Sequence, residues 1–255
     1  MRNSKIIMSI RMIFKMLLRQ KIVLLLILLI PVIFLLIVEL TASENIHPIE
    51  FLSLEVPESI YLPERQISLA YYSIATCGFL VAFLALFLVQ QNRLVNKRLI
   101  LCGYHPTELL MSTLVVMVII IAVIAVYVGC LALLFHKFDH VTGFISGLML
   151  IGFVYGCYGL FVGSLLKKEL EGILAIVLLV NIDVGWLQNP VFFTQSENKN
   201  FTQFLPGHYP SQSAIMRAFT EFPTDDITIY AIIYGLLFLS LAIVLYYFKM
   251  RIHKF

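Results

Sequence analysis

Residues 91–112 read QNRLVNKRLILCGYHPTELLMS and connect two long apolar stretches, residues 67–90 and 111–135. The connection carries three basic side chains ahead of a break at residues 102–106, and basic connections between membrane spans stay on the cytoplasmic side. The three basic residues are Arg93, Lys97 and Arg98. The stretch therefore predicts a cytoplasmic connection between two membrane-spanning helices, and the rest of the chain can be arranged outward from it.

The chain of 255 residues contains six such apolar runs. They cover residues 22–40, 67–90, 111–135, 142–166, 172–193 and 227–248. About twenty apolar residues are enough for a helix to cross the hydrocarbon core of a bilayer. Only 13% of the residues are charged, against about 25% in a soluble domain, and the mean hydropathy is +0.94. We therefore expect a single all-α polytopic membrane domain over residues 1–255, with six transmembrane helices.

The basic residues alternate between connections. Fourteen of the 18 lysines and arginines precede the first run or follow the second, fourth or sixth run, which predicts that both termini are cytoplasmic. The other four are Arg65, Lys137, Lys199 and Arg217. Because the basic residues flank apolar spans, we interpret them as partners of anionic membrane lipids and not as a nucleic-acid surface.

Residues 4–20 have the pattern of an amphipathic helix. Apolar residues recur at steps of three and four from Ile6 to Leu17, while Arg11 and Lys15 fall on the opposite side. A basic amphipathic helix lies in the membrane interface with its apolar face toward the lipid. We expect an interfacial helix here. The alternative is a charged flank that only sets the orientation of the first span.

The connection at residues 91–110 is longer than a turn between two spans needs. Its first half is basic and helical in pattern, and its break is followed by residues that suit a helix start. Pro106 has no amide proton to leave unpaired, and Glu108 favours a helix N-terminus. We expect a short helix that lies across the cytoplasmic face and presents polar side chains to a partner. The alternative is a solvated loop.

Glycines and prolines mark two further segments. The run at residues 142–166 carries six glycines, several at four-residue spacing, which permits close helix packing in lipid, so we expect it to lie centrally. Residues 194–226 are apolar and aromatic but are interrupted by proline and glycine. We expect a pair of re-entrant half-helices there on the outer side, since broken backbone at membrane depth is tolerated inside protein or beside a cavity.

Asp183 is the one acidic residue deep inside a predicted span. A carboxylate within a membrane is costly and by default points to function. One interpretation is that Asp183 lines a transport path or carries a proton. The other is that it is a structural partner for a hydroxyl, for Asn181 or for a basic group.

The sequence offers little for catalysis or metal binding. It contains no phosphate loop of the form G-x-x-x-x-G-K and no H-E-x-x-H or G-x-S-x-G motif. The four cysteines are isolated, and we interpret the short turn at residues 136–140, with two histidines and an aspartate, as a solvated loop. His208 is a candidate base with no nucleophile beside it in sequence. We expect no catalytic residues and no metal in this chain.

In their order along the chain, these features resemble the type-2 ABC transporter permeases, the half-transporter subunits of short-helix exporters. The segment RLILCGYHPTELLMS, residues 98–112, is similar to the family's leucine-rich stretch, proline-containing break and helix into the third span. The segment FLPGHYPSQSAIMRAF, residues 204–219, is similar to its proline-bearing outer half-helices. The chain departs from many members at residues 91–93 and 96–98, where QNR and NKR replace an acidic–arginine pair and a glycine–threonine.

The resemblance implies a partnership in a bacterial plasma membrane. Two permease copies, identical or related, would form the pore, and two copies of a separate ABC ATPase subunit would dock beneath it. The permease would bind no cofactor, because ATP and Mg²⁺ belong to the ATPase. Residues implied in ATPase coupling are Arg93, Lys97, Arg98, Tyr104, His105, Pro106 and Glu108. Residues implied in the substrate path or gate are Asp183, Asn181, Phe204, Pro206 and Phe219.

We expect ATP-driven export of an amphipathic or hydrophobic substrate. A peptide or drug is favoured, and a lipid or polysaccharide–lipid conjugate is the lesser alternative. A secondary transporter or channel that uses Asp183 is the main alternative from another class. An intramembrane enzyme would need paired catalytic residues at membrane depth.

Overall fold

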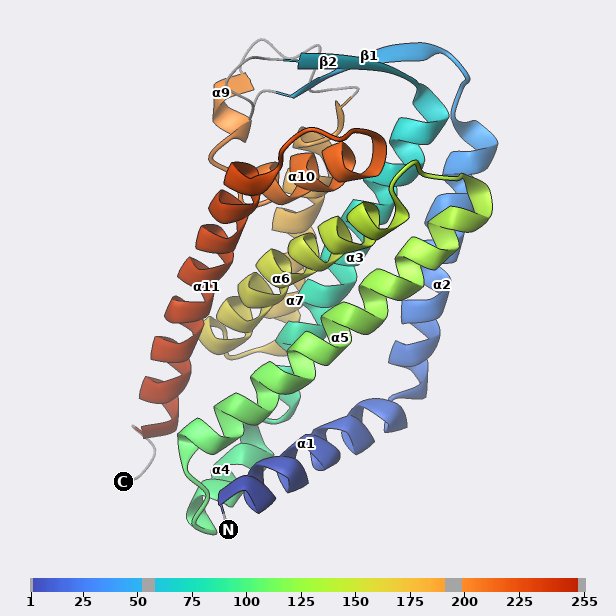
Figure 1. The fold of residues 1–255 in the computed structure, drawn as a ribbon. Helices are drawn as coiled ribbons and strands as arrows, with labels where there is room; N and C mark the ends of the chain where they lie inside the picture. Colours follow the sequence, from blue (N-terminus) through green and yellow to red (C-terminus); the bar gives the residue numbers. More distant parts are fainter. Residues whose placement is uncertain (1, 52–57, 191–198, 252–255) are drawn as a thin grey trace.

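The computed structural model describes residues 2–51, 58–190 and 199–251. The elements are α1 (Arg2–Arg19), α2 (Lys21–Thr41), β1 (Ile46–Phe51), β2 (Glu58–Pro63), α3 (Glu64–Gln91), α4 (Arg93–Leu101), α5 (Pro106–Phe135), α6 (Val141–Leu165), α7 (Glu169–Ile182), the π-helical turn η1 (Asp183–Leu187), α9 (Lys199–Thr202), α10 (His208–Phe219) and α11 (Asp225–Arg251). Figure 1 shows a helical bundle with a two-stranded hairpin at one end and both ends of the chain at the other.

The predicted six-span helical fold is confirmed. Within the described ranges, six helical segments are long and apolar enough to cross a membrane. They are Lys21–Thr41, Glu64–Gln91, Pro106–Phe135, Val141–Leu165, Glu169–Leu187 and Asp225–Lys249. The fifth joins α7 to η1, so its hydrogen bonding changes from α to π at Asp183.

α3 and α6 form the centre of the bundle. Of the 18 most apolar consecutive residues in each helix, 78% are buried in α3 and 67% in α6. The corresponding fractions are 17% in α2 and 22% in α11. Glycines on α6 allow this packing. A side-chain carbon at Gly159 would collide with the Ala82 carbonyl of α3, and one at Gly147 would lie 2.5 Å from the Ala214 Cα of α10. The prediction that the glycine-rich span is central is confirmed, and its glycines admit a helix on each of two sides.

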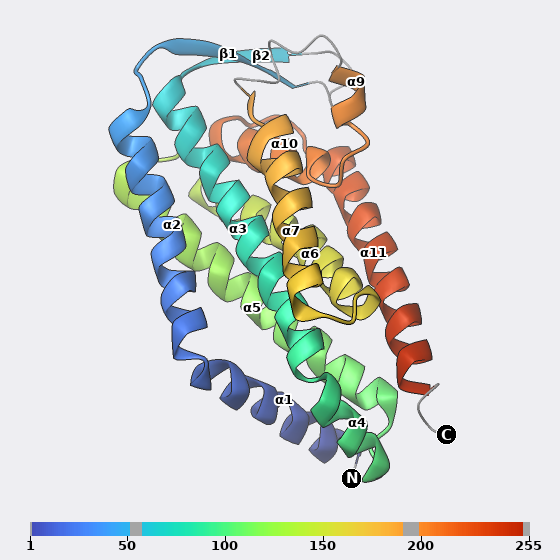
Figure 2. The same ribbon diagram turned by 180° about the vertical axis from the view of Figure 1, so that it is seen from behind.

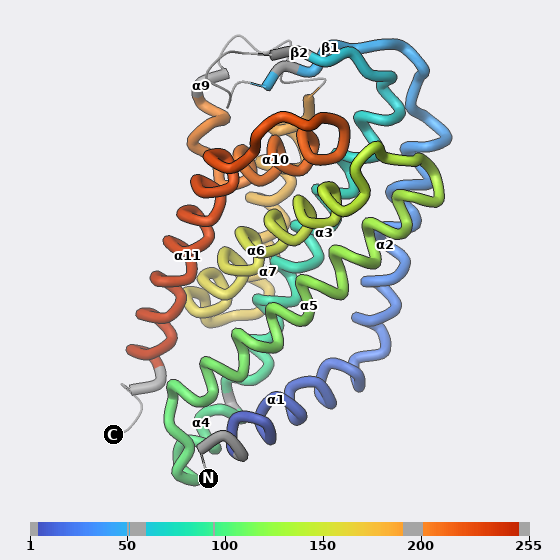
Figure 3. The backbone as a smooth tube through the Cα atoms, viewed as in Figure 1, coloured from blue at the N-terminus to red at the C-terminus, as the bar shows by residue number. Residues whose placement is uncertain are grey.

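α1 and α4 lie at the end of the bundle where the chain begins and ends (Figure 1). α1 turns away from α2 at Gln20 and crosses beneath the bundle (Figure 3), where it packs against α5 and buries Ile13. α4 follows the C-terminal end of α3 and is joined to α5 by a short turn. We call this end, which carries the N-terminal helix, α4 and the end of α11, the basic end.

The opposite end, which we call the hairpin end, carries β1, β2 and α10. The strands pair antiparallel, with Ile46 opposite Pro63. Arg65 at the start of α3 contacts Glu44 at 2.8 Å and Glu39 at 3.6 Å, which joins α2 to α3 near the hairpin. α10 lies across the bundle between the hairpin and the ends of the spans (Figures 1 and 3) and packs on α6 and α11.

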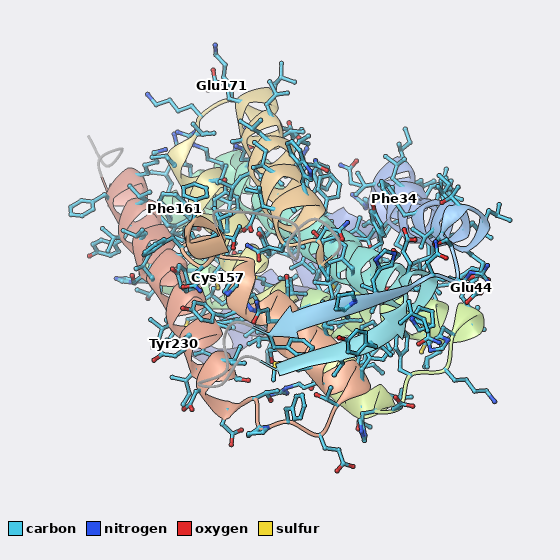
Figure 4. The ribbon with its side chains drawn as sticks, turned by 90° about the horizontal axis from the view of Figure 1, so that it is seen from above. Phe34, Glu44, Cys157, Phe161, Glu171 and Tyr230 are labelled. Atoms are coloured by element: carbon cyan, nitrogen blue, oxygen red, sulfur yellow. The ribbon has the colours of Figure 1, made fainter. Side chains whose placement is uncertain are left out.

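α2 and α11 stand on opposite flanks. Seen from above the hairpin end, Phe34 of α2 and Tyr230 of α11 lie on opposite sides of the molecule (Figure 4), and both side chains are exposed. Exposed leucine, isoleucine and phenylalanine side chains cover much of these two helices and of α7. Such surfaces are suited to lipid or to another apolar protein face.

Candidate functional site

A groove between α2, α3 and η1 is the largest cavity that we describe, with a volume of about 410 Å³. Figure 2 shows α2, α3 and α7, the helix that η1 continues, on one face of the bundle. The groove is lined by Ile30, Phe34, Tyr72, Ala75, Thr76, Phe79, Val180, Asn181 and Gly185. Phe34 and Asn181 are exposed, so the groove opens sideways between spans. An apolar groove with a few polar groups is the usual form of a small-molecule site.

Asn181 is the polar side chain of α7 in this groove. Its amide donates to the Val177 carbonyl at 2.7 Å, which fixes the side chain and uses one of its two donor hydrogens. The remaining hydrogen-bonding capacity is available to a molecule in the groove. The placement of Asn181 is therefore compatible with the substrate path that the sequence suggests.

Asp183 is two residues further along but is directed into the protein, where it is 1% exposed. Its carboxylate accepts hydrogen bonds from the Tyr155 hydroxyl of α6, from the Gly207 amide at 2.8 Å and from the Gln188 amide at 3.1 Å. Three donors satisfy much of the hydrogen-bonding capacity of a carboxylate. Asp183 thus holds three separate segments together, and Asn181 does not share its environment.

Gly207 is required by the close packing around this carboxylate. A side-chain carbon at Gly207 would lie 2.6 Å from Val184 Cγ2, 2.8 Å from the Tyr155 hydroxyl and 2.9 Å from Asp183 Oδ1. The π-helical geometry of η1 begins at Asp183 itself, and π-helical turns recur at functional sites. Where Asp183 meets the segment before α10, the helix changes to the wider π form, and a glycine on the other side leaves room for the carboxylate.

His208 extends the cluster. Its Nδ1 lies 3.0 Å from the Gln188 side-chain oxygen, and its ring packs edge-on against Tyr209 with 5.2 Å between ring centres. Burial lowers the pKa of His208 from 6.5 to about 4, so the imidazole is neutral at pH 7. We call Tyr155, Asp183, Gln188, Gly207 and His208 the Asp183 cluster.

At the basic end, α4 carries the three cations predicted for a partner surface. Arg93 and Lys97 are half-buried, and Arg98 is exposed. None of the three forms an ion pair with an acidic side chain of the described residues. The helix is anchored by Asn96, whose amide donates to the Tyr246 hydroxyl of α11 at 3.0 Å.

The turn between α4 and α5 confirms the predicted break. Gly103 has φ +88°, in the left-handed region that favours glycine. His105 and Glu108 form a capping box at the start of α5, with Pro106 in its first position. These two side chains cap the helix where Pro106 and Glu108 predict its start, and α5 continues from there without a break through the apolar run that begins at residue 111.

Tyr104 lies against α1 and is half-buried, whereas His105 is exposed. The Lys5 ammonium lies 5.2 Å from the centre of the Tyr104 ring and donates to the Gly103 carbonyl at 3.1 Å. The end of the turn is therefore attached to the N-terminal helix, a contact that no local sequence signal indicates.

The candidate gate residues are not brought together. Phe204 is 76% exposed, Pro206 is buried next to Gly207, and Phe219 packs on Phe138 at the other end of α10, with 5.5 Å between ring centres. Between residue 199 and the start of α11 at Asp225 the chain forms the four-residue α9 and the single helix α10. The first part of the expected pair of half-helices, residues 194–198, lies outside the described residues.

Comparison of the sequence with models of protein families and with curated proteins gives no match. Among the residues described, no group of three or more histidine, cysteine or acidic side chains is arranged to hold a metal ion. The groove, the Asp183 cluster and α4 are therefore the features of the described residues that bear on function.

Proposed function

We propose that this chain is the membrane-spanning permease subunit of an ATP-driven ABC exporter in a bacterial plasma membrane. The observation that carries the proposal is α4. It is a separate nine-residue helix between the second and third spans, it carries three cations, and it leads through a fixed turn into α5. A helix of this kind is suited to a cleft with acidic groups on a cytoplasmic ATPase.

The contacts of α4 support a coupling role. The Asn96–Tyr246 hydrogen bond connects α4 to α11, and the Gly103–Tyr104 turn contacts both α5 and Lys5 of α1. A displacement of α4 by a partner would therefore act on three helices at once. The partner would supply the energy from ATP, and the permease would supply two conformations with different affinities for the substrate.

The groove between α2, α3 and η1 supports the substrate class. Its lining is mainly apolar, with Tyr72, Thr76 and Asn181 as polar groups. We propose that a second permease copy faces this side of the molecule and that the groove binds an amphipathic or hydrophobic substrate, a peptide or drug being favoured. The exposed apolar surfaces of α2 and α7 are compatible with such a partner.

The hairpin end would then be the outer side. The Asp183 cluster joins the outer end of the fifth span to the segment before α10, and we propose that it holds the closed form of the outer gate. Phe204, Pro206 and Phe219 remain the candidate gate residues. Residues 194–226 would then be the re-entrant segment on the outer side of the membrane.

A secondary transporter that uses Asp183 is the second candidate. A buried carboxylate with three donors at the end of a span favours it. The groove lies on the Asn181 side of the same helix, so the carboxylate has no described path to a substrate there. Proton-driven transport that is lost in Asp183→Asn and needs no ATPase would favour this candidate over the first.

Co-purification tests the proposal. The full chain, tagged at its C-terminus, is extracted in mild detergent from the cells that produce it, and its companions are identified by mass spectrometry. We expect an ABC ATPase in equal amount, and we expect Lys97→Gln with Arg98→Gln to lose most of it. Lys137→Gln, which removes a cation at the hairpin end, is the control. A well-folded chain that is recovered without any ATPase would contradict the proposal.

A further inference from the structure

Two basic side chains from other segments lie within electrostatic range of the Lys249 ammonium at the basic end, on the side of α6 and α11. Arg93 begins α4, Lys167 lies in the turn between α6 and α7, and Lys249 is near the end of α11. The charges of Arg93 and Lys167 both act on the Lys249 ammonium. Like charges at such range oppose each other, and an anion placed among them would remove the cost.

The protein does not supply that anion from its described residues. Glu171, close in sequence, pairs with Lys168 at 3.3 Å, and no ion pair joins an acid of the described chain to Arg93, Lys167 or Lys249. The Lys249 ammonium donates to the carbonyl of Ser164 at 2.5 Å and to the neighbouring carbonyl of Leu165 at 2.7 Å. These oxygens end α6, and a helix C-terminus carries only about half a negative charge, so the three cations together keep a net positive charge.

The surface between them is hollowed. A hollow of about 20 Å³ is lined by Val89, Arg93, Gly163, Ser164, Tyr246 and Lys249. A hollow of this volume has room for about one water molecule, so a phosphate group would lie at its mouth and not inside it. At the mouth, its oxygens would be reached by the basic side chains on the rim.

A second hollow of about 20 Å³ continues from the first along the spans. The two share Val89, Ser164 and Tyr246, and the second is lined mainly by apolar side chains of α5, α6 and α11, among them Leu160 and Ile243. The surface thus has a basic part at the end of the spans and an apolar part within them. A phospholipid has the same order, with a charged headgroup followed by an acyl chain.

We propose that Arg93, Lys167 and Lys249 bind the phosphate headgroup of an anionic phospholipid whose acyl chain lies along the apolar surface at the second hollow, between α5, α6 and α11. The lipid belongs to the leaflet at the basic end. The site does not depend on the transport function, because it needs only the six-span fold. It also assigns Arg93 to the lipid and leaves Lys97 and Arg98 to face a protein partner.

Lipid retention by the purified full chain tests the site. Dioleoyl phosphatidylglycerol and dioleoyl phosphatidylcholine are titrated in detergent, and bound lipids are counted by native mass spectrometry. Each basic side chain near an anionic headgroup is worth about fivefold in affinity. We expect Arg93→Gln with Lys167→Gln to bind phosphatidylglycerol about 25-fold more weakly, with phosphatidylcholine unaffected. The matched pair Lys97→Gln with Lys168→Gln removes one cation from the same helix and one from the same turn, but neither is among the charges that act on Lys249. It is expected to change either affinity less than twofold.

Several results would overturn the proposal. Equal losses in the two charge-matched pairs would indicate diffuse attraction instead of a site. Equal retention of the two lipids by the unchanged protein would exclude a headgroup preference. Competition by glycerol 3-phosphate as strong as that by the lipid would show that a free phosphate compound is the ligand. Equal affinity for dihexanoyl and dioleoyl phosphatidylglycerol would remove the acyl chain from the apolar surface at the second hollow.

Discussion

Removal of the Tyr155 hydroxyl is expected to weaken the attachment of the fifth span to the segment before α10. In Tyr155→Phe the Asp183 carboxylate loses one of its three described donors and keeps the amides of Gly207 and Gln188. A hydrogen bond to a charged group contributes about 1.5–3 kcal/mol. Because the site is buried, water cannot easily replace the lost donor, and we expect the free energy of unfolding to fall by about 2 kcal/mol.

Tyr158→Phe is the matched control. Tyr158 lies one turn further along α6 and is also buried, and its hydroxyl makes no hydrogen bond within the described part of the chain. The same atom is removed, so the change in unfolding free energy is expected to stay within about 0.5 kcal/mol. Unfolding is followed by circular dichroism in mixed micelles as the fraction of dodecyl sulfate rises.

A double-mutant cycle separates this hydrogen bond from other effects of the two residues. If the bond is the reason for the loss, Tyr155→Phe will cost much less in the background of Asp183→Asn than alone. Additive losses, or a loss in Tyr155→Phe no larger than that in Tyr158→Phe, would refute the description of the Asp183 cluster.

Three further predictions concern other contacts. Gly207→Ala is expected to lower the free energy of unfolding by about 1–3 kcal/mol, because the added carbon would lie 2.6–2.9 Å from its neighbours. Gly185→Ala, where the nearest neighbour would lie at 3.4 Å, should lower it by less than about 1 kcal/mol. Thermal unfolding compares the two variants, and equal losses would contradict the close packing at Gly207. Because burial holds the pKa of His208 at about 4, the unfolded chain takes up a proton at higher pH than the folded one. Stability should therefore be complete above about pH 6.5 and fall by up to about 3 kcal/mol towards pH 4; an identical pH slope in His208→Gln would disprove this origin. The Asn96–Tyr246 bond should give a coupling of about 0.5–1.5 kcal/mol between Asn96→Ala and Tyr246→Phe in unfolding, and strictly additive losses would exclude it.

The six spans were predictable because membrane insertion imposes a length and a hydropathy that a single segment displays by itself. The break after α4 was also predictable from a single segment, because Gly103 supplies a left-handed backbone position and Pro106 suits a helix start. Both effects are local. The capping box at the start of α5 had a local signal at Glu108 alone, because histidine is an uncommon N-cap and His105 is not recognisable as one from the sequence.

The Asp183 cluster was only half predictable. The cost of a buried carboxylate singled out Asp183, but its donors Tyr155 and Gly207 are 28 and 24 residues away in sequence. No sequence signal near Asp183 indicates these partners, because the pairing depends on how α6 and the segment before α10 pack in three dimensions. The opposite placements of Asn181 and Asp183 follow from ordinary helix geometry, because residues two positions apart lie about 200° apart around a helix.

Cross-linking from Cys102 tests the transport proposal most directly. Cys102 is exposed in the turn after α4, while Cys77 and Cys157 are buried and Cys130 lies within a span. A membrane-impermeant photoreactive maleimide is attached to Cys102 in inside-out vesicles from the cells that produce the protein. The proposal predicts labelling from the cytoplasmic side and, after illumination, a covalent adduct with an ABC ATPase subunit that is lost in Cys102→Ser. Labelling only in right-side-out vesicles, or adducts without any ATPase, would contradict it.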